Sequence, residues 1–220
     1  MEPVIQIKNL RTSFMTSNGE VQAVRGVSFS VNPGEILGVV GESGSGKSVT
    51  SMSILRLLAD TAVIKENSEI LFEGENLINV NKKKLRSIRG EKISMIFQEM
   101  SPFPNLTVAE NMYIGREPHK LHFLKKKELR EKAKAQLKKL NISLNIDTPV
   151  KNLTVSEMQL LEIAKAVSYQ SQIVIMDEPT SALTDSEVRI LFDMIAKLKK
   201  QGLQLYISVI NWMNCLKLLM

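Results

Sequence analysis

The sequence is poor in cysteine, histidine and aromatic residues. It has one cysteine and two histidines, and aromatic residues make up 5% of its 220 positions. Because Cys215 is alone, no disulfide bond can form within the chain, and a reducing compartment is expected. His119 and His122 have no metal-ligating residues near them in the sequence, so we interpret both as surface residues.

Long apolar runs are also absent. No stretch approaches the ~20 apolar residues that a membrane-spanning helix needs. The chain passes from Met1-Glu2-Pro3 directly into an alternating pattern, without the basic and apolar segments of a signal peptide. We therefore expect that any role at a membrane depends on a partner protein.

The formal charge is unbalanced, at +6. Such an excess is compatible with binding to nucleic acid, anionic lipid or a phosphorylated ligand. Much of it lies in two short runs, Lys82 to Lys84 and Lys125 to Lys127, which are typical of solvated helix or loop faces. The length suits one sizeable domain with its own core.

The remaining sequence predicts an α/β domain. Alternating or buried apolar runs predict strands at 4–8, 27–31, 36–40, 69–72, 93–97, 173–176 and 205–209, with a turn at Asn18-Gly19. Helices are expected at 47–59 and over the whole of about 107–169, which includes a strongly charged helix at 125–140. Thr107 with Glu110 and Ser156 with Gln159 have the spacing of capping boxes, and Thr184 with Glu187 is expected to cap a helix that follows.

A glycine-rich segment between the third strand and the first helix carries the strongest signal. Gly41 to Ser48 fits the pattern G-x-x-x-x-G-K-S/T of a phosphate-binding loop, or P-loop. Its glycines allow backbone N–H groups to point at phosphate oxygens, and the helix N-terminus adds a favourable dipole. Lys47 is expected to bridge the β- and γ-phosphates and Ser48 to ligate Mg²⁺. The expected nucleotide-binding residues here are Gly41, Glu42, Ser43, Gly44, Ser45, Gly46, Lys47, Ser48 and Val49.

Two acids at the end of a later apolar strand fit the same chemistry. A P-loop alone is compatible with kinases, GTPases and motor proteins. Asp177, directly after the strand at 173–176, can hold Mg²⁺ through water, and Glu178 beside it can orient or deprotonate an attacking water. Phosphoryl transfer depends mainly on such positioning and charge stabilisation.

The ordered set of motifs resembles the ATPases of ABC transporters over residues 4–208. Asp177 to Asp185 resembles their Walker B end and D-loop, Gln98 lies where that family has its Q-loop glutamine, and the segment 153–159 resembles the ABC signature. The resemblance implies a P-loop NTPase fold with an antiparallel β layer and an inserted helical subdomain. It also implies a head-to-tail dimer in which ATP lies between the P-loop of one subunit and the signature of the other.

The resemblance assigns further residues to the site. Ser48, Gln98 and Asp177 would surround Mg²⁺, and Glu178 and Gln98 would serve catalysis. Ser156, where the family more often has glycine, would contact the opposite ATP together with Gln159. Phe14 is the aromatic residue most suited to stack on adenine, as in the family's A-loop, although a core position is an open alternative.

The two halves of the chain resemble different branches of the family. Residues 10–99 resemble oligopeptide importer ATPases, and residues from 105 onward resemble monosaccharide importer ATPases, so a recombined gene or one divergent lineage would explain the join. After Tyr206-Ile207-Ser208 the family places a switch histidine, where this chain has Val209. The following residues match no pattern expected of the family and are typical of a truncation with an unrelated tail.

These observations predict the ATP-binding subunit of an ABC transporter, which hydrolyses ATP to import a sugar or a peptide through a membrane permease. The expected domain spans 1–208, with a helical subdomain at about 100–169 and an atypical tail at 209–220. Expected partners are the permease and a second ABC ATPase domain, without nucleic acid, and the expected location is the inner face of the cell membrane. The alternatives are a truncated ATP-binding module without effective turnover and, less in keeping with the sequence, a soluble ABC ATPase acting on DNA or ribosomes.

Overall fold

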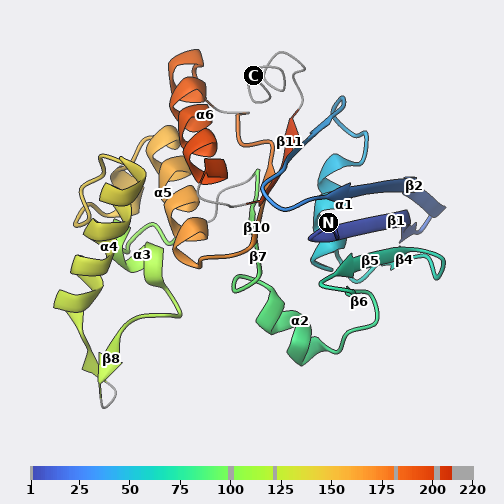
Figure 1. The fold of residues 1–220 in the computed structure, drawn as a ribbon, viewed down its shortest axis with the longest axis horizontal. Helices are drawn as coiled ribbons and strands as arrows, with labels where there is room; N and C mark the ends of the chain where they lie inside the picture. Colours follow the sequence, from blue (N-terminus) through green and yellow to red (C-terminus); the bar gives the residue numbers. More distant parts are fainter. Residues whose placement is uncertain (1, 99–101, 121–122, 181–182, 201–203, 210–220) are drawn as a thin grey trace.

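The computed structural model describes residues 2–98, 102–120, 123–180, 183–200 and 204–209. They form an α/β fold in which a parallel sheet lies between an antiparallel sheet on one side and a group of helices on the other (Figure 1). The predicted tail at 210–220 lies outside the described residues.

The antiparallel sheet is built from the N-terminal third of the chain. Strands β1 (Ile5–Thr16) and β2 (Gly19–Val31) form a hairpin around the predicted turn at Asn18-Gly19. Strand β1 also pairs with β4 and β5, so the order is β2-β1-β5-β6 with β4 beside β1. The remaining strands are β4 (Ala62–Ile64), β5 (Glu69–Phe72) and β6 (Glu75–Asn76).

The parallel sheet has the order β3-β11-β10-β7. Its strands are β3 (Ile36–Val40), β7 (Ile93–Ile96), β10 (Ile173–Asp177) and β11 (Gln204–Val209). All three neighbouring pairs are parallel, so the carboxyl ends of the strands meet at one edge of the sheet. The last described strand, β11, thus lies between β3 and β10, two strands far apart in sequence.

Alternate residues of β10 enter two different hydrophobic cores. Val174 and Met176 pack with the helices, whereas Ile173 and Ile175 pack with the antiparallel sheet and α1 (Lys47–Ile54). All five residues of β10 are buried. A strand covered on both faces reads as a continuous apolar run, which is why the sequence predicted it so clearly.

The helical group follows β7 in the chain and precedes β10. It contains α3 (Val108–Tyr113), α4 (Lys126–Leu140) and α5 (Val155–Ser168), with a 3₁₀ turn at Val150–Asn152 and a hairpin of β8 (His119–Lys120) and β9 (Phe123–Leu124). Helix α6 (Asp185–Lys200) follows β10, and α2 (Lys82–Ile88) precedes β7. This order is the one expected of an inserted helical subdomain, while the domain boundaries at 100, 169 and 208 stay a prediction.

Capping explains where the helices begin. The capping box predicted at Thr107 and Glu110 is confirmed at the start of α3, and its hydrogen bonds from Thr107 hold the pKa of the Glu110 carboxyl below its usual value. The predicted cap of the later helix is also confirmed, because the backbone N–H and the hydroxyl of Thr184 both donate to Glu187 at 2.8 Å.

Three local predictions were wrong. Helix α1 ends at Ile54 instead of 59, because Arg56 has the left-handed φ of 52° and the guanidinium of Arg89 binds the carbonyls of Leu55 and Arg56. The segment 107–169 is not helical throughout, since it includes the β8–β9 hairpin. Strands β1 and β2 are longer than predicted, because register shifts along their pairing interrupt the period-two alternation.

The capping box predicted at Ser156 and Gln159 was also wrong. Helix α5 begins two residues earlier, with Thr154 as N-cap and Glu157 completing the box. The hydroxyl of Thr154 donates to Glu157, and the backbone N–H of Glu157 donates back to that hydroxyl. Within the described residues, no helix is long and apolar enough to cross a membrane.

Candidate active site

The P-loop connects the carboxyl end of β3 to α1, and its shape requires glycine. Gly46 has a φ of 93°, and a Cβ at this position would lie 2.6 Å from the carbonyl oxygen of Ala23 in β2. Gly44 also has a positive φ, of 79°. The sequence therefore places glycine where an L side chain would be strained or would clash.

Lys47 is the first residue of α1, and its side chain reaches back to the loop. Its Nζ donates to the carbonyl oxygens of Gly41 at 2.8 Å and Glu42 at 2.9 Å. Its side chain is only 4% exposed and lies 3.3 Å from Oε1 of Glu178, whose side chain is 7% exposed. A buried cation therefore lies beside a buried carboxylate from the residue that follows β10.

The two acids lie at the carboxyl end of β10, as predicted. The hydroxyl of Ser208 in β11 donates to Oδ1 of Asp177 at 2.6 Å. The backbone N–H of Glu178 donates to both the hydroxyl and the carbonyl oxygen of Ser208, each at 3.1 Å. Ser208, which the sequence interpretation missed, therefore fixes both acids from the neighbouring strand.

Glu178 has an unusual backbone conformation. Its φ is 49°, in the left-handed region that side chains other than glycine rarely adopt. Such strain persists only where surrounding contacts hold it, and it gathers at functional sites. At Glu178 it turns the chain sharply after β10 while the carboxylate stays beside Lys47.

Parallel pairing brings these parts to one edge. Asp177 pairs with Ser208, and Val209 pairs with Val40, the residue before the P-loop. Val209, where a switch histidine was expected, is therefore next to the first residue of the loop in the sheet. The carboxyl edge of an open parallel sheet is where α/β folds generally bind ligands.

The other predicted residues lie on α1, after β7 and on β1. Ser48 and Val49 are half-buried in the first turn of α1, and Gln98 is exposed two residues beyond the end of β7. Phe14 is half-buried in β1 and pairs with β2, the strand whose Ala23 touches the P-loop. No ligand contact tests these assignments or those of Glu42, Ser43 and Ser45, so their roles stay predictions.

The signature segment is held differently. Ser156 is half-buried, with its hydroxyl 3.2 Å from that of Thr154. The Ser156 hydroxyl, followed by Thr184, holds the pKa of the Glu187 carboxyl below its usual value. Gln159 is buried, and its Nε2 donates to the carbonyl oxygen of Pro179 at 2.6 Å. Sequence reasoning gave no sign of either long-range contact.

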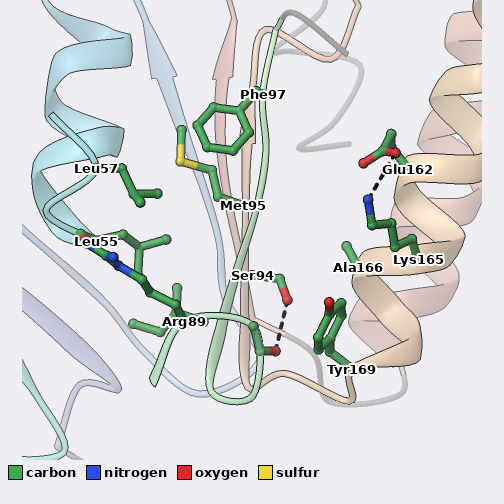
Figure 2. Close-up of a pocket in the computed structure, with 12 residues that line it drawn as sticks. Leu55, Leu57, Arg89, Ser94, Met95, Phe97, Glu162, Lys165, Ala166 and Tyr169 are labelled. Atoms are coloured by element: carbon green, nitrogen blue, oxygen red, sulfur yellow. Dashed lines mark hydrogen bonds and ion pairs between the residues drawn. The ribbon is translucent and has the colours of Figure 1, made fainter. Parts of the chain in front are cut away.

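A groove of about 370 Å³ separates α5 from the parallel sheet and the end of α1 (Figure 2). Phe97, which precedes Gln98, lines it and is 44% exposed. Lys165 in α5 lies 3.4 Å from Glu162 on the same wall. The sheet side of the groove thus combines apolar residues such as Met95 and Phe97 with Arg89 and Ser94, and the α5 side carries Glu162 and Lys165.

Metal-binding groups are sparse. Among the described residues, no three His, Cys, Asp or Glu side chains lie close enough together to hold a metal ion. A cation here would need oxygen donors such as Ser48, Asp177 and Gln98, completed by water and ligand oxygens. Mg²⁺ is usually bound in this way, through one or two protein groups plus phosphate oxygens and water.

Comparison with known proteins gives a consistent result. The family model described as "ABC transporter" matches residues 24–181. A putative ribose/galactose/methyl galactoside import ATP-binding protein of Geobacillus kaustophilus is 40% identical over 187 residues, which is 84% of this chain and 36% of that protein. The ribose import ATP-binding protein RbsA of Bacillus subtilis is 37% identical over 206 residues, which is 93% of this chain and 39% of that protein. The chain spans 36–40% of the length of the curated relatives compared.

Solved structures share the fold. The ATP-binding cassette MJ0796 bound to ADP and Pi has a TM-score of 0.81 at 22% identity, covering 96% of this chain and 89% of that one. The ADP conformation of the cassette MJ1267 has a TM-score of 0.79 at 25% identity, covering 99% of this chain and 85% of that one. Both confirm the predicted fold class, an α/β fold of the P-loop NTPase type.

Proposed function

Because this chain belongs to the ABC transporter ATP-binding family, we propose that it binds and hydrolyses ATP to drive the import of a sugar. The observation that carries the proposal is the buried ion pair between Lys47 and Glu178, 3.3 Å apart, beside a loop whose shape requires glycine. A buried cation at such a loop suits a phosphate chain, and a buried carboxylate beside it suits a base for water.

The residues of the site have different roles in this proposal. Backbone N–H groups of the loop and the Lys47 ammonium bind the phosphates of ATP. Glu178, held against Lys47 by the backbone turn after β10, orients a water and accepts its proton. Ser156, at the start of α5, faces the ATP of a second domain in the proposed head-to-tail dimer.

Mg²⁺ fits the oxygen donors at the sheet edge. Ser48, Gln98 and Asp177 would hold it, and Ser208 keeps the Asp177 carboxylate in place through a hydrogen bond of 2.6 Å. When bound, the ion would neutralise charge that develops on the transferred phosphoryl group. Phe14, on the strand beside β2, would stack on adenine.

The relatives support a sugar over a peptide. The proteins of Geobacillus kaustophilus and Bacillus subtilis are named for the import of ribose or galactose. The part of the chain after residue 105, where the resemblance to monosaccharide importers lies, includes all of α5 and its wall of the groove. We therefore propose a pentose or hexose as the solute.

The groove beside α5 supports a membrane partner. Phe97 gives it an exposed apolar wall, and Gln98 follows Phe97 directly. A permease segment bound there would contact the residue before a proposed Mg²⁺ ligand, so permease and nucleotide could affect one another. This arrangement would hold the protein against the inner face of the cell membrane.

ATP titration of a Lys47→Ala variant tests the proposal. Loss of charge-assisted hydrogen bonds of about 1.5–3 kcal/mol should weaken binding of a fluorescent ATP analogue by ~10- to 100-fold. Lys165→Ala is the matched control, because Lys165 pairs with Glu162 away from the P-loop. Equal affinity of wild type and Lys47→Ala would refute the phosphate-binding role.

A catalytically weak ATP-binding module is the second candidate. Val209 favours it, since this residue pairs with Val40 next to the P-loop and has no hydrogen-bond donor in its side chain. Such a module would bind ATP as tightly as an active domain but release phosphate slowly. Phosphate release by the purified chain at saturating ATP distinguishes the two.

A further inference from the structure

Glu178 is held from both sides along the backbone. On its N-terminal side, its own N–H group is bound by Ser208 of β11 at 3.1 Å. On its C-terminal side, the carbonyl of Pro179 accepts a hydrogen bond of 2.6 Å from the amide of Gln159 in α5. Between these two points lies the left-handed φ of 49° at Glu178.

The Gln159 contact is protected from solvent. Gln159 is 6% exposed, and Pro179 is buried. A buried carbonyl that loses its donor pays the cost of desolvation without compensation. If Gln159 turned toward the ATP of another subunit, the Pro179 carbonyl would lose this donor. The geometry therefore disfavours the intermolecular role that the sequence suggested for Gln159.

We propose that Gln159 is a positioning residue that acts within its own subunit. By holding the Pro179 carbonyl, it fixes the turn after β10 and keeps the Glu178 carboxylate 3.3 Å from Lys47. The inference rests on the ATPase function proposed above. It links the signature helix α5 to the proposed catalytic base, so that a displacement of α5 would alter the position of that base.

The test compares two glutamines near opposite ends of β10. Gln159→Met keeps the length of the side chain but removes the donor to Pro179. Gln172→Met is the matched control, because Gln172 precedes β10 and so lies at the opposite end of this strand from Glu178. Its Nε2 donates to Glu73 at 2.9 Å. Circular dichroism and thermal melting establish that each variant is folded. If Gln159→Met does not fold, Gln159→Asn, which keeps the amide but is one methylene shorter, replaces it.

Two measurements follow for each protein. The first is NMR-detected hydrogen exchange at the Glu178 amide. We expect exchange to be ~10-fold faster in Gln159→Met, as for loss of one buried hydrogen bond, and unchanged in Gln172→Met.

The second measurement is single-turnover phosphate release, with ATP affinity measured in parallel. The rate constant should fall ~10- to 100-fold in Gln159→Met while ATP affinity stays within about twofold, because misplacement of a catalytic group affects the chemical step.

The outcomes separate the inference from the proposed function. Unchanged exchange at Glu178 overturns the inference, and so does a loss confined to ATP affinity or ATP-dependent dimerisation, which would restore the intermolecular role. A wild-type chain that binds no ATP overturns the proposed function. If wild type binds ATP but releases no measurable phosphate, exchange alone decides: ~10-fold faster exchange in Gln159→Met supports the inference, and an unchanged rate rejects it.

Discussion

The two segments proposed to contact ATP are held in place by different kinds of contact. The P-loop wall, which we define as Lys47, Asp177, Glu178 and Ser208, joins residues up to 161 positions apart in sequence through the buried bonds at Lys47 and Ser208. The signature turn, residues 154–157, is held mainly by its own capping box. The wall is therefore a product of the whole fold, whereas the signature turn is largely a local structure at the surface.

This difference predicts where substitutions act. A change in the P-loop wall should alter chemistry or the stability of the whole domain, because its contacts cross the sheet. A change in the signature turn should affect one helix end and any surface it presents to another subunit. Substitutions within the two regions, and in the strand β11 that carries Ser208, test this contrast.

The largest effect is expected from Glu178→Gln. Glutamine keeps the shape but cannot accept the proton of water, so turnover should fall ~10²- to 10⁴-fold while ATP affinity is retained. Phosphate release and analogue titration measure the two quantities. Glu73→Gln, which alters a surface pair with Lys92, is the control that should leave turnover unchanged. An unchanged rate in Glu178→Gln would remove Glu178 from catalysis.

Val209→His should raise the turnover rate, whereas Glu178→Gln lowers it. A histidine at this position, next to the start of the P-loop, would add one hydrogen-bond donor for charge on the γ-phosphate. Such a donor is worth ~10²- to 10³-fold in rate. Val209→Leu, which adds bulk without a donor, should not raise turnover. If the unmodified chain already turns over at about 1–10³ per second, the missing donor is not limiting.

Tyr206, two residues before Ser208 in β11, tests how the free energy of unfolding depends on this strand at high pH. Burial raises the pKa of its phenol to about 12, against about 10 in an unfolded chain. The neutral phenol therefore stabilises the fold fully below pH ~10, and this contribution is lost as pH rises from ~10 to ~12. At pH 11 the loss is about 1.4 kcal/mol. Urea unfolding at pH 9 and 11 measures the change in the free energy of unfolding between these pH values. We expect this change to be smaller in Tyr206→Phe than in wild type. Equal changes in both proteins would contradict the prediction.

The smallest effect is expected in the signature turn. Thr154→Ala should cost about 1 kcal/mol of unfolding free energy, as loss of an N-cap typically does. Thr107→Ala removes the matching capping box of α3 and should cost a similar amount. Only Thr154→Ala should also weaken ATP-dependent dimerisation, measured by sedimentation velocity. A large loss of ATP affinity in the monomer would show that the signature turn supports the P-loop wall after all.

The sequence predicted features that depend on local pattern or on chemistry at fixed spacing. The positions of the P-loop after β3 and of Asp177 at the end of β10 could be predicted, because the pattern of a buried strand followed by polar residues is visible in the sequence alone. The cap of α5 was misplaced because the sequence offers two overlapping capping boxes, Thr154 with Glu157 and Ser156 with Gln159. Hydrogen-bond geometry in the structure decides between them in favour of Thr154.

Long-range contacts could not be predicted in the same way. Ser208 is an ordinary polar residue near the end of an apolar strand, and its role depends on β11 pairing beside β10. The bond from Gln159 to Pro179 requires α5 to pack against the turn after β10. Neither the order of strands nor the direction of a side chain follows from sequence periodicity, so both contacts emerge only with the fold.

The place of β11 in the sheet also affects how the protein forms during synthesis. Strands β3 and β10 are not neighbours, since β11 lies between them and pairs with both. While residues 204–209 are still inside the ribosome, the P-loop strand lacks its parallel neighbour among the described strands, and two strand edges are unpaired. Such edges can associate with other chains. Pairing across so long a stretch of chain is slow, so the nucleotide site assembles late, and the nascent chain is most exposed to misfolding just before β11 emerges.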